Sequence, residues 1–154
     1  MVDLHLRLPP QVLRQLEETL ARFADPQNLE ARCDPALVEE DPEMREIWRN
    51  ALREQLMQDV HWLSRHLGLW KGSRGRQRVP EDEAEGIIRA CSAIRVRVRE
   101  LALSRLSDEL LETGDFNPQE LTEEETVALQ GYILLAGLQA HVVEALDPEC
   151  AEEP

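Results

Sequence analysis

Residues 122–146, which read TEEETVALQGYILLAGLQAHVVEAL, decide the fold. Thr122 followed three residues later by Glu125 forms a capping box, a pattern typical of a helix start. From residue 126 to residue 143 no formally charged side chain occurs when His141 is counted as neutral. That length approaches a membrane span, but the two glutamines and the histidine within it argue against lipid. We therefore expect the most buried helix of the protein here, surrounded by other helices or lying at a homodimer interface.

Apolar residues that recur every three or four positions predict three more helices upstream. The first covers residues 10–24. The second starts with Asp41 as N-cap and Pro42 in the first turn, and it ends at Gly68, a natural helix stop. The third starts at residue 80 and continues as far as residue 106 or 112. The second helix carries the cleanest core-facing stripe, which comprises Met44, Ile47, Trp48, Ala51, Leu52, Leu56, Val60, Leu63 and Leu67.

The N-terminus follows a different period. Residues 2–8 alternate apolar and polar side chains, which is typical of a strand. A lone strand is not stable, so it must pair or pack in extended form. The sequence therefore predicts an all-α fold: four main helices in a bundle with a short N-terminal extended arm or strand over residues 1–8. We expect one domain over residues 1–154, with a basic loop at 68–79 and an acidic tail at 147–154.

Charge is unevenly distributed along the chain. The formal net charge of −14 disfavours direct binding to nucleic acid, because phosphate backbones are also negative. Residues 68–105 nevertheless hold nine basic and five acidic residues, a local net charge of +4, whereas residues 106–154 hold thirteen acidic residues and no lysine or arginine. Solvated helix faces would explain this pattern, and so would an anionic C-terminal half that recognises a basic partner surface.

The three cysteines and the start of the chain favour the cytoplasm. No signal peptide is visible after Met1. Cys33, Cys91 and Cys150 are an odd number at wide spacing, which fits neither a disulfide framework nor a zinc site. Cys91 falls on a core stripe and is expected to be a packed, inert thiol. Cys33 and Cys150 are the candidates for a redox role, because they fall in a connector and in the tail.

Catalytic motifs are missing from the sequence: no nucleophile elbow, phosphate loop, dinucleotide fingerprint or zinc-protease pair occurs. His61 and His66 are five residues apart on one helix, so they cannot bind one metal ion together. We expect no cofactor and no enzymatic activity. An enzyme centred on His141 remains an alternative to a hydrogen-bonded, buried histidine at that position.

A protein-binding surface is the leading hypothesis. Arg95 and Arg99 share one helix face, where they either bridge to glutamates of neighbouring helices or join the basic loop in a binding patch. Trp70 beside that loop is expected to be exposed, and tryptophan and tyrosine are common interface anchors. The residues that we expect at a partner-binding surface are Trp70, Arg74, Arg76, Arg95, Arg99, Tyr132 and Gln139.

Three segments carry a resemblance to a known family. The first is Asp41-Pro42 followed by Arg45, Trp48 and Leu52; the second is Glu83-Ala84-Glu85 followed by Ile94-Arg95 and Arg99-Glu100-Leu101; the third is Tyr132-Ile133-Leu134-Leu135 followed by Leu138-Gln139, Val143 and Leu146. In this order they resemble the actinobacterial oxidative-stress-regulator (AosR-like) family, formerly a domain of unknown function. The resemblance spans most of residues 8–147.

The resemblance implies a cytoplasmic helical protein and, in the characterised branch of the family, a redox-responsive regulator that acts through a sigma factor. The sequence departs from that pattern because it has no cysteine before Cys33, so no redox pair can be mapped onto it. We therefore predict a non-enzymatic cytoplasmic regulatory or adaptor protein that binds another protein. A thiol-based redox switch and the His141-centred enzyme are the alternatives.

Overall fold

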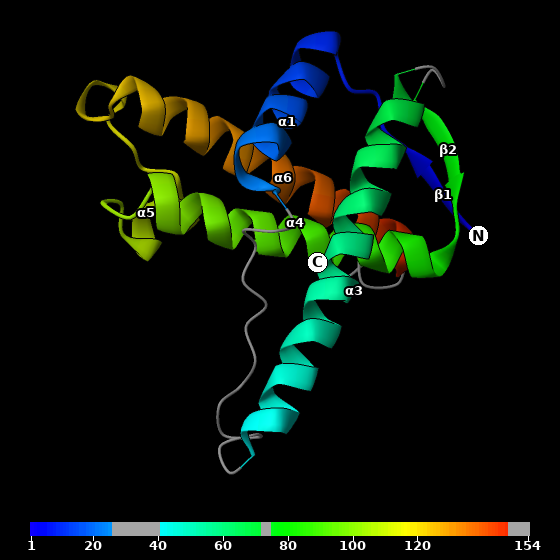
Figure 1. Cartoon of the computed structure of the whole chain (residues 1–154). Helices are drawn as coiled ribbons and strands as arrows, with labels where there is room; N and C mark the ends of the chain where they lie inside the picture. The colour runs from blue at the N-terminus through cyan, green and yellow to red at the C-terminus, as the bar shows by residue number, and fades with distance from the viewer. Residues whose placement is uncertain (26–40, 72–74, 148–154) are drawn as a thin grey trace.

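The computed structural model describes residues 1–25, 41–71 and 75–147, and it confirms an all-α fold with a short N-terminal strand. The elements are β1 (Val2–His5), α1 (Pro10–Phe23), α3 (Pro42–Trp70), β2 (Arg76–Val79), α4 (Glu81–Ala102), α5 (Asp108–Thr113), a 3-10 turn (Pro118–Glu120) and α6 (Glu123–Leu146), as Figure 1 shows. The predicted caps are confirmed. Asp41 accepts a hydrogen bond from the backbone N–H of Glu43, and Thr122 with Glu125 forms the capping box of α6.

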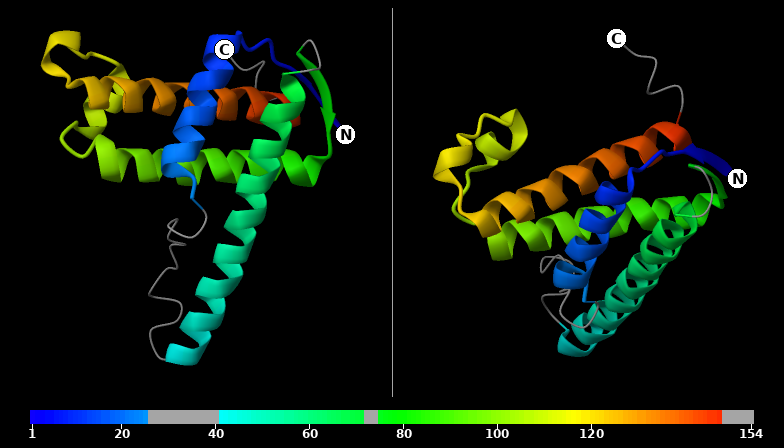
Figure 2. Two further views of the ribbon diagram at one scale, coloured as in Figure 1. Left: turned by 45° about the horizontal axis from the view of Figure 1, so that its top comes forward. Right: turned by 90° about the horizontal axis from the view of Figure 1, so that it is seen from above.

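An antiparallel pair of helices, α4 and α6, forms the centre of the body, and α1 and α3 both cross the same side of this pair (Figure 2). The apolar faces of these four helices meet in one core. Its largest fully buried side chains are Leu4, Leu16, Leu63, Leu67, Ile87, Ile94, Leu103 and Leu135. Leu4 belongs to β1, so the strand closes one end of the helical core.

The bounds predicted for the basic loop, residues 68 and 79, are both wrong. Its last four described residues form β2, which pairs antiparallel with β1 from Val2 opposite Val79 to His5 opposite Arg76. The strand at the N-terminus needs a partner, and β2 supplies its backbone hydrogen bonds while Val79 is buried. The loop begins only after Trp70, because α3 continues through Gly68.

One further helix end and the burial of the last helix differ from the predictions. The third predicted helix ends at Ala102 rather than at residue 106 or 112, and Leu103, the residue after it, is fully buried. Ser107 then caps the separate helix α5. The final helix is also less buried than its composition predicted. Among the described helices, α6 is long and apolar enough to cross a membrane. Only 33% of its most apolar stretch is buried inside the protein, and Ile133 is 55% exposed.

Candidate functional site

The first half of α3 projects away from the body, as Figure 1 shows. We name residues 42–58 the α3 arm, because the first buried residue along α3 is Asp59. Ile47 is 62% exposed, Trp48 49% and Met44 45%. The prediction that the whole apolar stripe of this helix faces the core is therefore wrong for its first half, and an apolar surface is left uncovered by the other described elements.

Helical geometry explains this difference. At 100° per residue, the exposed residues Met44, Ile47 and Trp48 point in a direction roughly 100° away from the face that is buried between residues 59 and 70. The three-four spacing of apolar residues thus continues along α3 while the face it marks rotates. One side of the exposed stripe carries Arg45 and Arg49, and the other side carries glutamates, so the stripe is narrow and has charged edges.

An ion pair fixes α3 to α4 where the arm leaves the body. Asp59 is 1% exposed and accepts hydrogen bonds from Nε and Nη2 of Arg89 at 2.9 and 3.0 Å, and from Gln55 Nε2 at 3.0 Å. The hydrogen bond to Asp59 raises the pKa of Arg89. Gly86 leaves room for this pair, because a Cβ there would lie 3.0 Å from Asp59 Oδ1. The junction therefore holds the arm in one direction.

A second buried pair ties the same two helices together further along. His66 Nε2 lies 2.6 Å from Glu83 Oε2, and the His66 side chain is almost completely buried. The Trp70 ring stacks obliquely beside His66, with 6.4 Å between ring centroids. Trp70 itself is only 4% exposed, so its prediction as an exposed partner-binding residue is wrong. Its large ring anchors the end of α3 in the core and explains why the helix continues past Gly68.

Three of the predicted partner-binding residues meet at the surface between α4 and α6. Arg95 donates from Nη1 to Gln139 Oε1 at 2.8 Å and from Nη2 to Tyr132 Oη at 3.2 Å. Its guanidinium carbon lies 4.7 Å from the Tyr132 ring centroid, a distance typical of a cation–π contact. Gln139 in turn donates to Ser92 Oγ at 2.6 Å. Arg95 therefore bridges the two helices through neutral groups rather than through glutamates.

The remaining predicted residues do not join this cluster. Arg99 forms an ion pair with Asp108 of α5. Arg76 is exposed on β2, opposite His5. Arg74 and the candidate redox residues Cys33 and Cys150 lie outside the described residues, so their predicted roles are untested. No hydrogen bond or ion pair among the described residues joins Arg76 to Arg95 or Arg99. The patch that would unite the basic segment with the α4 arginines stays a prediction, because Arg74 lies outside the described residues.

Cys91 and His141, the described cysteine and the candidate general base, both have buried reactive atoms. Cys91 is fully buried, and burial raises the pKa of its thiol to about 12, so it is protonated at neutral pH. His141 Nε2 is buried and has no hydrogen-bond partner among the described residues. In that part of the chain, no group of three or more histidine, cysteine, aspartate or glutamate side chains is placed to hold a metal ion.

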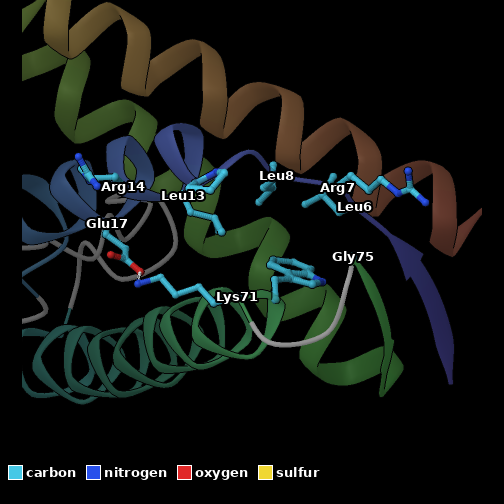
Figure 3. A pocket seen from close by; sticks show the side chains of 10 residues that line it. Leu6, Arg7, Leu8, Leu13, Arg14, Glu17, Lys71 and Gly75 are labelled. Atoms are coloured by element: carbon cyan, nitrogen blue, oxygen red, sulfur yellow. Dashed lines mark ion pairs between the residues drawn. The ribbon is translucent and has the colours of Figure 1, made fainter.

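One pocket lies between the N-terminal segment, the start of α1 and the end of α3. Its cavity volume is about 670 Å³. Figure 3 shows Leu8 and Leu13 along its wall, with Arg14 at one end and Arg7 at the other. Lys71, the residue after α3, reaches toward Glu17 of α1. Lys71 and Glu17 form an ion pair. The pocket could not be predicted from the sequence, because its residues come from three segments that no motif connects.

Comparisons of the chain with family models, with curated proteins and with solved structures found no match. The resemblance to the oxidative-stress-regulator family therefore stays a prediction. The structure offers three candidate binding features: the exposed α3 arm, the Arg95 cluster and the pocket beside α1.

Proposed function

We propose that this chain is a non-enzymatic regulatory or adaptor protein of the cytoplasm, and that it binds another protein through the α3 arm. The partner provides an apolar groove into which the exposed face of the arm inserts. The family resemblance implies a sigma factor as that partner; the residues of this chain do not identify it.

The observation that carries the proposal is the exposure of Ile47 and Trp48 on a helix that projects from the body. Large apolar side chains that are gathered on one exposed face are typical of protein-binding sites. Tryptophan is among the residues that most often dominate the binding free energy of an interface, with losses of 2 kcal/mol or more on truncation to alanine. Trp48 is therefore the anchor that we expect to contribute most.

The shape of the arm determines what kind of partner fits it. A single projecting helix is convex, so a partner must be concave to cover it. The exposed face presents Met44, Ile47, Trp48 and Ala51, which follow the i, i+3, i+4, i+7 spacing by which a helix inserts into a hydrophobic groove. Charged residues on both sides of this stripe would remain at the polar rim of such an interface.

The test compares variants of the tagged protein in capture from native lysate, with quantification by mass spectrometry. Ile47→Asp and Trp48→Ala should both lose the same captured protein, because one places a charge in the groove and the other removes the anchor. The matched control is Leu101→Asp, which changes a leucine that is 57% exposed on α4. We expect the control to retain the partner.

The folding of the variants and the self-association of the wild type are measured separately. Circular dichroism should show wild-type helix content for all three variants, because the changed side chains are exposed. Sedimentation velocity of the purified wild type should show one copy. A dimer that dissociates on Ile47→Asp would mean that the arm binds a second copy of the chain, and equal capture by the arm variants and the wild type would mean that it binds nothing. Either result contradicts the proposal.

A further inference from the structure

The pocket beside α1 combines an apolar wall with charged ends. Leu8 and Leu13 line it together with the ring of Trp70. Its volume of about 670 Å³ falls within the roughly 300–1,000 Å³ of pockets that hold small molecules. Apolar walls favour the burial of a hydrocarbon or aromatic body, at roughly 25 cal/mol for each Å² removed from water.

The charges at its ends are mainly positive. Glu17 already forms an ion pair with Lys71, so these two charges offset each other. Arg7 and Arg14 are exposed, and neither has an ion-pair partner among the described residues. Two unpaired guanidinium groups around one pocket are unexpected in a chain with a net charge of −14. Guanidinium groups bind carboxylates and other oxyanions through paired hydrogen bonds.

We propose that this pocket binds a small amphipathic anion: an apolar body lies against Leu8, Leu13 and Trp70, and an anionic head group reaches Arg7 or Arg14. Figure 3 shows that these two arginines stand at opposite ends of the apolar wall, so the head group selects one of them. The pocket lies at the C-terminal end of α3, whereas the α3 arm is its N-terminal half. The ligand site is thus separate from the protein-binding surface proposed above.

The test uses two fluorescent probes that share one apolar body. 8-Anilinonaphthalene-1-sulfonate carries an anionic head group, and N-phenyl-1-naphthylamine is its neutral counterpart. Both are titrated into the full chain and into the double variant Arg7→Gln/Arg14→Gln. The double variant should bind the sulfonate about tenfold more weakly, the loss expected when a charge-assisted hydrogen bond is removed. Binding of the neutral probe should not change.

Four further variants locate the site. Each single arginine variant shows which end holds the head group. Leu8→Trp should weaken both probes, because the larger ring fills the pocket, and Arg97→Gln, an arginine on α4 outside the pocket, should weaken neither. Circular dichroism confirms that each variant is folded.

Three results would overturn the proposal. The first is unchanged affinity of the double arginine variant for the sulfonate. The second is an equal loss for both probes in that variant, which would show damage to the apolar wall rather than recognition of charge. The third is wild-type binding of both probes by Leu8→Trp, which would place them elsewhere, for example on the exposed α3 arm.

Discussion

Replacing Gly131 with alanine should force α1 away from α6. These helices cross (Figure 2), and Gly131 of α6 lies against Thr19 of α1. An ideal Cβ on Gly131 would lie 2.3 Å from Thr19 Oγ1, 2.9 Å from its Cγ2 and 3.1 Å from its Cβ. Thr19 is buried and donates a hydrogen bond to Gln15 O at 2.8 Å. Rotation of the threonine cannot relieve the clash, because both branches occupy the contact.

The expected magnitude follows from two opposing effects. Overpacking of a buried contact costs about 1–3 kcal/mol, and more where the backbone must move. Alanine returns up to about 1 kcal/mol of helix propensity relative to glycine. Since the backbone of one helix must shift here, we expect Gly131→Ala to lower the free energy of unfolding by about 2 kcal/mol. Gly137→Ala on the same helix is the matched control, because its Cβ would meet nothing within 4 Å.

Urea unfolding followed by circular dichroism measures both variants. Gly137→Ala should be as stable as the wild type or slightly more stable. Adding Thr19→Ala to Gly131→Ala should recover part of the loss, because Oγ1 and Cγ2 are then removed and only Cβ remains close. If Gly131→Ala proves as stable as Gly137→Ala, the close approach of α1 to α6 is wrong.

Three further predictions concern single side chains. The hydrogen bond from Arg105, followed by the backbone N–H of Thr122, lowers the pKa of Glu125 to about 2. A carboxylate with a lowered folded-state pKa stabilises the fold above its ordinary pKa near 4.5 and loses that contribution as the pH falls toward 2. In Glu125→Gln the free energy of unfolding should therefore depend less on pH between these two values than in the wild type. Asp59→Asn should lower the free energy of unfolding in urea by about 2 kcal/mol, because it removes the charged acceptor of Arg89. An unchanged urea midpoint would contradict the role of this pair. Cys91 should react with iodoacetamide only as fast as the protein unfolds, whereas rapid labelling in native buffer would show that the thiol is accessible.

The sequence predicted the helices well because their start signals are local. The Asp41 cap and the capping box at Thr122 depend on residues within one turn, and both were found where expected. Helix ends were predicted less well, because burial of distant side chains decides them. Gly68 is a poor helix residue, yet the buried ring of Trp70 keeps the helix intact for two more residues.

Trp48 and Trp70, two of the three tryptophans of α3, exchanged their predicted roles for a related reason. Periodicity shows which residues share a helix face, but it does not show how far the neighbouring helices extend along that face. Trp48 lies on a regular apolar stripe and is exposed, because α3 is longer than the body that it packs against. Trp70 follows a glycine beside a basic segment and is buried, because the end of α3 lies against the start of α1.

The candidate sites were predictable to different degrees. Arg95, Tyr132 and Gln139 were among the residues predicted for a partner-binding surface, and their side chains meet. The pair between Asp59 and Arg89 was missed, although an aspartate next to the apolar stripe of a long helix was a usable signal. Strand β2 could not be predicted from its own residues, since RQRV has one apolar side chain and pairs because β1 needs a neighbour.

Photo-crosslinking from position 47 tests the central claim most directly. A benzophenone amino acid replaces Ile47 in one variant and Leu101, the exposed control on α4, in the other, and both are irradiated in intact cells. The proposed function predicts a crosslinked adduct with one other protein from position 47 and none with that protein from position 101. An absence of adducts at position 47, or adducts formed only with a second copy of this chain, would contradict the claim that the α3 arm binds a different protein.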